Sequence, residues 1–256
     1  MKTQNLVLRF FILFTIGIAF IILVSMVFSS CKNEQSGAPG TLQLKASSNQ
    51  TLKSATIAFV NGASITLDAA KVEIKNLRIE ENSGNDNQSG NQSGNDGKDG
   101  NEKSSKSEAG DAGDIILAGP YLVDILSGTG SIDQVTVLPG TYKKVDFDFA
   151  TGSENNGHSI VLSGTFTNAL GTAIPFKLTS EIAETVQLPL AGNGVQIISG
   201  GIVSISILFD VNNWINKLDL NTAAVNNGEI IINSSENQEL YLTFKTEVMK
   251  NIEAKD

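Results

Sequence analysis

The residue in this chain with the clearest covalent chemistry is its only cysteine, Cys31. A basic tip precedes an uncharged run over residues 10–28, and two serines stand directly before the cysteine. Lipoprotein signal peptidases need small residues before the cysteine, which then carries the acyl chains. The pattern therefore predicts a lipoprotein signal peptide over residues 1–30 and lipidation at Cys31.

The same run has a second interpretation, an uncleaved transmembrane anchor, because its length also suits a bilayer-spanning helix. The lipoprotein is favoured because an anchor gives no reason for the position of Cys31. In either case we expect a cell-envelope protein, lipid-anchored to the outer membrane, with its body on the periplasmic or the surface-exposed face. Residues 31–40 are then a flexible tether, and the polar stretch 32–35 resembles tethers that send lipoproteins to the cell surface.

Histidine chemistry is restricted to one residue, His158, in a turn-like stretch. A zinc site of histidines and cysteines is excluded by count. A serine hydrolase would need His158 as its base, and no nucleophile elbow accompanies it. We interpret His158 as a solvated loop residue. Phosphate-binding glycine motifs are also missing from the sequence.

Two carboxylates, Asp146 and Asp148, share one face of a predicted strand, about 7 Å apart, which lies within the range for an inverting glycosidase. Alternating charge on an outer strand face is equally expected of a soluble sandwich, and neighbouring lysines fit that interpretation. A calcium-loop pattern begins at Asn95 but reaches Lys106 at its terminal position. We expect no catalytic residues, no cofactor, no metal site and no enzymatic activity.

The net charge argues against nucleic acid as a partner. Loss of Lys2 and Arg9 with the signal peptide moves the formal charge from −9 to −11, and phosphate backbones repel an acidic body. Once Cys31 is lipidated no thiol is left for a disulfide, so a hydrophobic core must supply the stability.

A break in composition covers residues 81–114, which contain many Gly, Asn, Ser and Asp residues. Its long polar stretch cannot offset the entropy of ordering, so we expect a disordered insertion. Because residues 41–80 are too few for a core of their own, the insertion is predicted to bridge two strands of a single domain, 41–256.

Most of the rest of the chain alternates apolar and polar residues with a period of two, which predicts strands with one buried face. A parity shift at Lys75 and Asn76 indicates a bulge. The expected strands lie near residue 42 and at 55–60, 64–67, 72–79, 121–126, 135–138, 142–149, 159–167, 174–178, 186–190, 203–211 and 229–232. We predict an all-β fold, a two-sheet antiparallel β-sandwich of immunoglobulin or transthyretin type with a short C-terminal helix.

The C-terminal helix is predicted from a capping box formed by Ser235 and Gln238 and from apolar residues four apart. These are Leu240, Phe244, Val248 and Ile252. We expect this apolar stripe to pack on the chain's own domain. The alternative is that the helix binds a partner. A shorter helical turn at 212–216 would place Trp214 as a core plug.

Three stretches in this order, 119–126, 138–145 and 207–214, resemble the bacterial lipoprotein family catalogued as domain of unknown function 4382. The segment 237–241 is similar to the helical ending of its members. The resemblance spans residues 41–250, and the insertion departs from the compact hairpin usual there. It implies a secreted β-sandwich and supplies no established activity or catalytic residues.

Together these features predict a non-enzymatic lipoprotein that binds or scaffolds an envelope partner, of adhesin or pilus-associated type, held to the membrane by its lipid. The alternative is a glycan-binding surface module. Its candidate stacking platforms are Tyr121, Tyr142, Tyr241 and Trp214. Tyr142 also follows a Pro-Gly turn, where its hydroxyl is expected to bond back to the backbone, as in a tyrosine corner.

Overall fold

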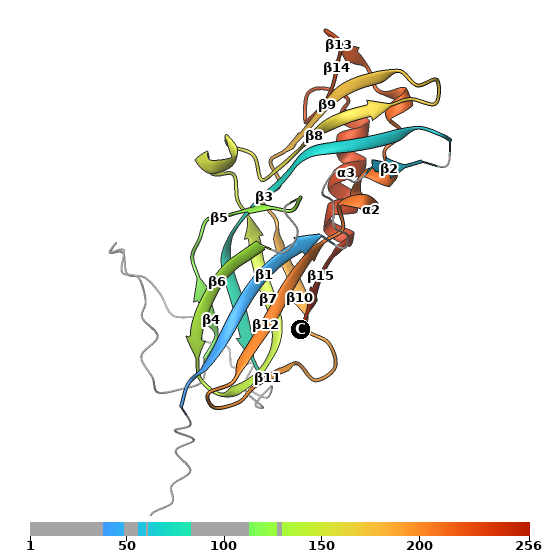
Figure 1. The fold of residues 1–256 in the computed structure, drawn as a ribbon. Coiled ribbons are helices and arrows are strands. Elements are labelled where there is room, and N and C mark those ends of the chain that lie inside the picture. Colours follow the sequence, from blue (N-terminus) through green and yellow to red (C-terminus); the bar gives the residue numbers. More distant parts are fainter. Residues whose placement is uncertain (1–37, 49–55, 60, 83–112, 127–129) are drawn as a thin grey trace, which may run out of the picture. The chain divides into compact units, whose positions relative to one another are not determined.

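Strands form most of the described chain and pair into two sheets, so the predicted all-β sandwich fold is confirmed (Figure 1). The computed structural model describes residues 38–48, 56–59, 61–82, 113–126 and 130–256. Contacts between Cα atoms group Gly37–Asp256 into one compact unit. The predicted signal peptide, tether cysteine and most of the insertion lie outside the described residues.

The smaller sheet has four strands in the order β15-β12-β1-β6. Their bounds are Ile252–Lys255, Ile202–Phe209, Gly40–Ser48 and Gly130–Val137 respectively. β1 runs parallel to β12, whereas the other two pairings are antiparallel. Its core face includes Leu42, Leu44 and Ile207, each fully buried.

The larger sheet follows the order β10-β7-β3-β8-β9-β14-β13, with β2, β4, β5 and β11 attached beside β3 or β7. Its strands are β2 (Thr56–Ala58), β3 (Ser64–Glu81), β4 (Ile115–Leu117), β5 (Tyr121–Asp124), β7 (Gly140–Phe149), β8 (Ile160–Thr167), β9 (Ala173–Ser180), β10 (Thr185–Pro189), β11 (Val195–Ile197), β13 (Val225–Asn226) and β14 (Glu229–Ile232). β14 and β9 are parallel, and the other pairings are antiparallel.

β3 is a single strand of 18 residues, where the sequence pattern predicts separate strands. Its first half pairs with β8 and its second half with β7. The bulge predicted at Lys75 and Asn76 is confirmed, because the register with β7 shifts there and Asn76 has a φ of 51°. The bulge lets one strand keep its apolar side chains inward across the change of partner.

Glu73 lies on β3 between the residues that pair with β8 and those that pair with β7. Its backbone N–H donates to Ser159 O at 2.8 Å, and its carbonyl accepts from Ala150 N at 2.9 Å. The side chain is fully buried, and its Oε2 accepts the Asn155 N–H at 3.1 Å. A β-carbon at Gly152 would overlap this carboxylate. The carboxylate therefore ties the β7–β8 connection, with the 3-10 turn η2 (Ser153–Asn155), to the sheet.

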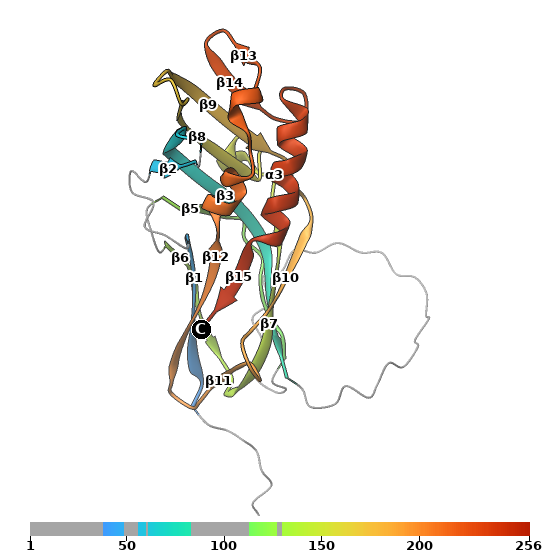
Figure 2. The same ribbon diagram turned by 90° about the vertical axis from the view of Figure 1, so that its right-hand side faces the viewer.

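The longest of the C-terminal helical segments contacts β9 and β14 of the larger sheet (Figure 2). These segments are α2 (Val211–Asn216), the 3-10 turn η3 (Leu220–Thr222) and α3 (Gln238–Lys250). On α3, Tyr241, Phe244 and Val248 are buried against the chain's own core. The interpretation that this helix packs on its own domain is therefore confirmed.

Two details of the C-terminal prediction are wrong. The capping box of Ser235 and Gln238 does not form, since Asn237 is the N-cap, at a φ of 49° and with no side-chain cap. The Asn237 amide instead donates to the carbonyls of Ala224 and Ile231. Ile252 does not continue the helical stripe but begins β15, where pairing with β12 offers it a buried position.

Four aromatic rings join both sheets and both helices in one continuous series. Phe147 of β7 lies 6.1 Å from Phe209 of β12 between ring centroids. Trp214 of α2 lies 6.0 Å from Phe209 and 6.0 Å from Phe244 of α3. All three contacts are edge-to-face, the arrangement that aromatic quadrupoles favour. Trp214 is fully buried, which confirms its predicted role as a core plug.

Replacing the central ring of this series should be severely destabilising. We expect Trp214→Ala to lower the free energy of unfolding by about 3–5 kcal/mol, through lost burial and the cavity left behind. Leu242→Ala is the matched control, because Leu242 is 55% exposed on α3 and should change it by less than about 0.5 kcal/mol. Urea unfolding followed by circular dichroism measures both. Similar losses in the two variants would contradict this role.

Candidate functional site

The lipidation residue predicted from the sequence, Cys31, lies outside the described residues, as does the calcium-like stretch 95–106. Where the structure describes the chain, no helix is both long and apolar enough to cross a bilayer. Nor do three His, Cys, Asp or Glu side chains converge there to hold a metal ion.

The two carboxylates weighed as a catalytic pair are bound within the fold. Asp148 accepts from Thr185 Oγ1 at 2.6 Å and from Asn76 Nδ2 at 2.8 Å, and these hydrogen bonds lower the pKa of its carboxyl. Asp146 forms an ion pair with Lys144 at 3.2 Å. The expectation that Asp146 lies on a solvated outer face is wrong, since it is 6% exposed. It is buried because β7 is an interior strand, flanked by β3 and β10.

His158 is half-buried at the end of the β7–β8 connection. Its Nδ1 lies 3.6 Å from Glu181 Oε1 and has no hydrogen-bond partner among the described residues. The adjacent Ser159 Oγ donates to the carbonyl of Ser180 at 3.0 Å. That hydroxyl is therefore engaged by the backbone rather than directed at the imidazole, and the geometry does not assemble a nucleophile and base.

Three of the four aromatic residues proposed as glycan platforms are buried: Trp214, Tyr142 and Tyr241 are 0%, 1% and 8% exposed. That expectation is wrong for them because all three face the core. The predicted hydrogen bond from the Tyr142 hydroxyl to the backbone is confirmed, since the hydroxyl donates to Leu138 O at 3.0 Å. Tyr121 is half-buried and donates to Asp133 Oδ2 at 2.9 Å.

Both tyrosine hydroxyls resist ionisation. Burial, and then the charge of Glu81, raises the pKa of Tyr142 from 10.0 to about 12. Burial, and then the hydrogen bond and charge of Asp133, raises the pKa of Tyr121 to about 12 as well. These phenols serve as fixed hydrogen-bond donors in the fold, and neither is poised for proton transfer near neutral pH.

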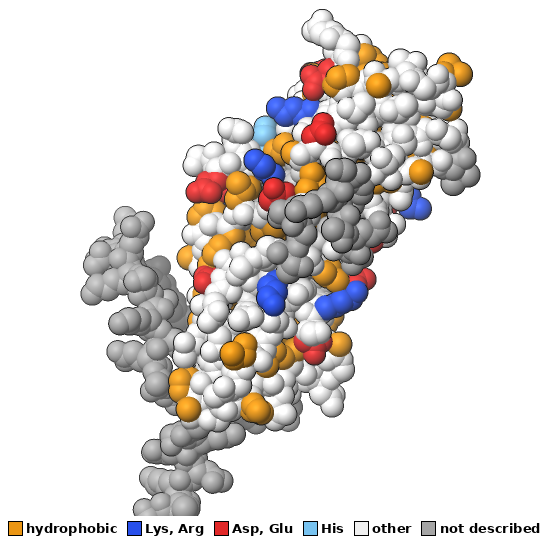
Figure 3. All heavy atoms as spheres, in the orientation of Figure 1, with side chains coloured by type: hydrophobic (Ala, Val, Ile, Leu, Met, Phe, Trp, Pro, Cys, Tyr) orange, Lys and Arg blue, Asp and Glu red, His pale blue; other side chains and the backbone are white. Residues whose placement is uncertain are grey.

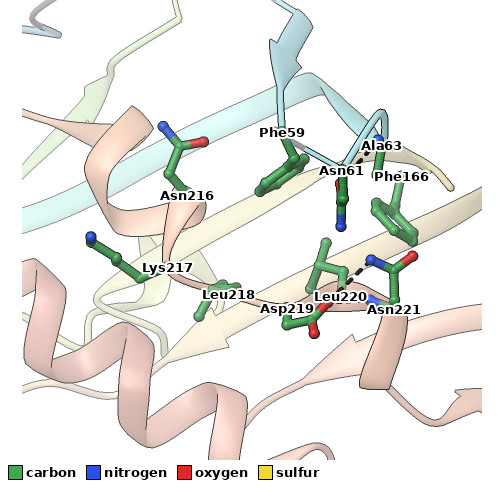
Figure 4. Close-up of a pocket in the computed structure, with 10 residues that line it drawn as sticks. All are labelled: Phe59, Asn61, Ala63, Phe166, Asn216, Lys217, Leu218, Asp219, Leu220 and Asn221. Atoms are coloured by element: carbon green, nitrogen blue, oxygen red, sulfur yellow. Dashed lines mark hydrogen bonds between the residues drawn. The ribbon is translucent and has the colours of Figure 1, made fainter. Parts of the chain in front are cut away.

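A cavity of about 270 Å³ opens where the β2–β3 turn approaches the segment after α2 (Figure 4). Its size is close to the lower bound, about 300 Å³, for small-molecule sites. The lining residues are Phe59, Asn61, Ala63, Phe166, Asn216, Lys217, Leu218, Asp219, Leu220 and Asn221. The close-up shows Phe59 and Asn61 extending toward Leu220 from the opposite wall.

The floor of the cavity is apolar and its rim is polar. Phe166, Leu218 and Leu220 are buried, whereas the amide, lysine and carboxylate residues of the rim are exposed. Asp219 Oδ1 accepts from the backbone N–H of Asn221 at 3.2 Å and from its Nδ2 at 3.1 Å. The η3 turn therefore fixes this carboxylate and amide beside the half-buried ring of Phe59.

This arrangement suits binding of a small ligand with an apolar face and several hydroxyl or amide groups. Apolar contact with Phe59 and Leu220 would hold the ligand, and Asn61 and Asn221 would orient it. A single carboxylate, Asp219, belongs to the lining, whereas glycoside hydrolysis uses a pair. Sequence reasoning missed this cavity because its walls come from segments far apart in the chain, and no local spacing links them.

Comparisons with known proteins add no family to this geometry. No protein-family model matches the chain, and no curated protein or solved structure is significantly similar to it.

The raised tyrosine pKa values predict alkaline instability with a definite pH window. The folded chain holds two phenol protons that the unfolded chain releases above pH 10.0, because folding raises both pKa values to about 12. The stability from these groups is complete below pH 10.0 and is lost as the pH rises toward about 12. In urea titrations across this window, the variant with Tyr121→Phe and Tyr142→Phe should lose less free energy of unfolding than the wild type. Equal losses would contradict the assignment.

Proposed function

We propose that this chain is a lipid-anchored protein of the bacterial cell envelope that binds or scaffolds a partner without catalysis, of adhesin or pilus-associated type. The observation that carries the proposal is Cys31, the chain's only cysteine, which follows an uncharged apolar run and two small residues. The resemblance to domain of unknown function 4382 supports the same assignment, and membership in that family is part of the proposal.

The geometry of the described residues favours binding over catalysis. The carboxylates of Asp146 and Asp148 are held by ion pairs and hydrogen bonds within the sheet. His158 does not meet a hydroxyl nucleophile in the described chain. A body stabilised by a hydrophobic core without disulfides suits a scaffold on a membrane surface.

Whole-cell proteolysis, combined with a globomycin-type block of lipoprotein cleavage, tests the proposed lipid anchor and the proposed location at the cell surface. Without the block, we expect added protease to cut the polar segment 83–112 on intact cells, because a surface lipoprotein exposes it. Under the block, and for Cys31→Ala, the longer precursor should accumulate. Protection from protease with unchanged size in every case would indicate an uncleaved anchor that faces the periplasm, and the adhesin proposal would fail.

The second candidate function is glycan binding, and the cavity beside Phe59 favours it. Sugar-binding sites combine a ring that stacks on the apolar face of a sugar with amides and carboxylates that bond its hydroxyls. Phe59, Asn61, Asp219 and Asn221 supply these groups in one lining. This site replaces the buried platforms as the basis of the glycan proposal.

A glycan array probed with the full chain in detergent tests this candidate. We expect Phe59→Ala to weaken binding of any glycan retained by the wild type by about tenfold, through lost apolar contact. Leu170→Ala is the matched control, because Leu170 is 92% exposed in the β8–β9 turn and lies outside the cavity lining. A flat array response from the wild type, or equal binding by Phe59→Ala, would exclude this function.

A further inference from the structure

Three segments meet at the end of the body where the described chain begins. We call residues 38–41, 137–141 and 195–204 together the entry end. Strand pairing joins them through Gly40 with Val137, Thr41 with Ile202, and Ile197 with Gly140. The Gly200 N–H donates to Ala38 O at 3.2 Å, and the Thr41 N–H donates to Gly201 O at 2.8 Å. The chain therefore leaves the body beside the β11–β12 turn.

The entry end carries no charged residue in any of its three segments, in a protein whose residues are 18% charged. From outside these segments, the carboxylate of Glu81 lies beside Gly140, and Lys45 Nζ donates to Ser204 Oγ at 3.1 Å. Figure 3 shows hydrophobic side chains exposed at this end on the face that it displays. An uncharged end on an acidic body is a feature that solubility alone does not require.

Two large apolar side chains are exposed on the turn that forms the tip of the entry end. Ile198 is 62% exposed and Ile202 is 69% exposed. The glycines between them permit the tight turn, with a φ of 68° at Gly200. Exposed aliphatic side chains grouped on one uncharged surface are typical of a contact with a protein or a membrane.

The short tether makes the membrane the expected partner of this exposed apolar surface. Only six residues lie between Cys31 and Ala38, and the seven residue steps from one to the other span at most about 25 Å when the chain is fully extended. An acylated Cys31 therefore keeps the entry end within that distance of the bilayer. We propose that Ile198 and Ile202 insert into the lipid interface and dock the entry end on the membrane that holds the anchor.

This docking rests on the proposed lipid anchor and adds a second, weak attachment to it. Acyl chains at one residue leave a body free to rotate, whereas two inserted isoleucines would orient it. The formal charge of −11 left after the signal is removed would oppose approach to anionic lipid. Docking should therefore be stronger on zwitterionic vesicles than on vesicles with added anionic lipid.

Site-specific fluorescence on the full acylated chain tests the docking. Because acylation consumes Cys31, Ile202→Cys supplies the single free thiol, to which an environment-sensitive fluorophore is attached. The labelled protein is reconstituted in phosphatidylcholine vesicles that contain lipids with a bromine quencher in the acyl chain. Ile198→Cys is the second test position, and Leu170→Cys, exposed in the β8–β9 turn, is the matched control. Emission from buried Trp214 checks that each variant is folded.

We expect a blue-shifted emission and several-fold stronger quenching at positions 198 and 202 than at position 170. Water-like emission at both test positions, or equal quenching at all three, would overturn the docking. A shift that depends on the protein-to-lipid ratio would assign the surface to a second copy of the chain and would also overturn it. Failure of the lipid anchor is detected separately, because Cys31 would then react with the fluorophore.

Discussion

The edge-to-face contacts among Phe147, Phe209, Trp214 and Phe244 are the interaction on which the rest of the structure depends. They connect a strand of each sheet to α2 and then to α3, so both layers and the helical cover share one core. The indole N–H of Trp214 donates to Asn251 O at 3.2 Å, which places the start of β15. With no disulfide available, this apolar continuity is the constraint that positions the chain from Phe209 to β15.

The long strand β3 connects the two ends of the described body. Its first half, with β8, supports the β2–β3 turn and the cavity beside Phe59, and its second half, with β7, leads to the entry end. Glu73 holds the junction between the two halves. Figure 1 shows β2 and β11 toward opposite ends of the described body, so the cavity lined by residues 59–63 lies far from the entry end. A membrane attachment at the entry end would leave the cavity accessible to an extracellular or periplasmic ligand.

Period-two alternation predicted the strands because one face of each is buried, and β14 coincides with the predicted range 229–232. The bulge at Asn76 and the plug at Trp214 were also predictable, since a parity shift and an apolar turn after a strand are local signals. The burial of Asp146 and the strand at Ile252 were not, because neighbouring strands decide both. The cavity was equally beyond local patterns, since Phe59 and Asn221 meet only through the tertiary fold.

The central functional claim is that the mature protein begins at Cys31 with acyl chains on that residue. Intact mass spectrometry of the protein purified from membranes measures this directly. We expect a mass equal to residues 31–256 plus a diacylglyceryl group, with or without a further acyl chain. A mass equal to the unmodified 256-residue chain would contradict the lipid anchor and, with it, the proposed function.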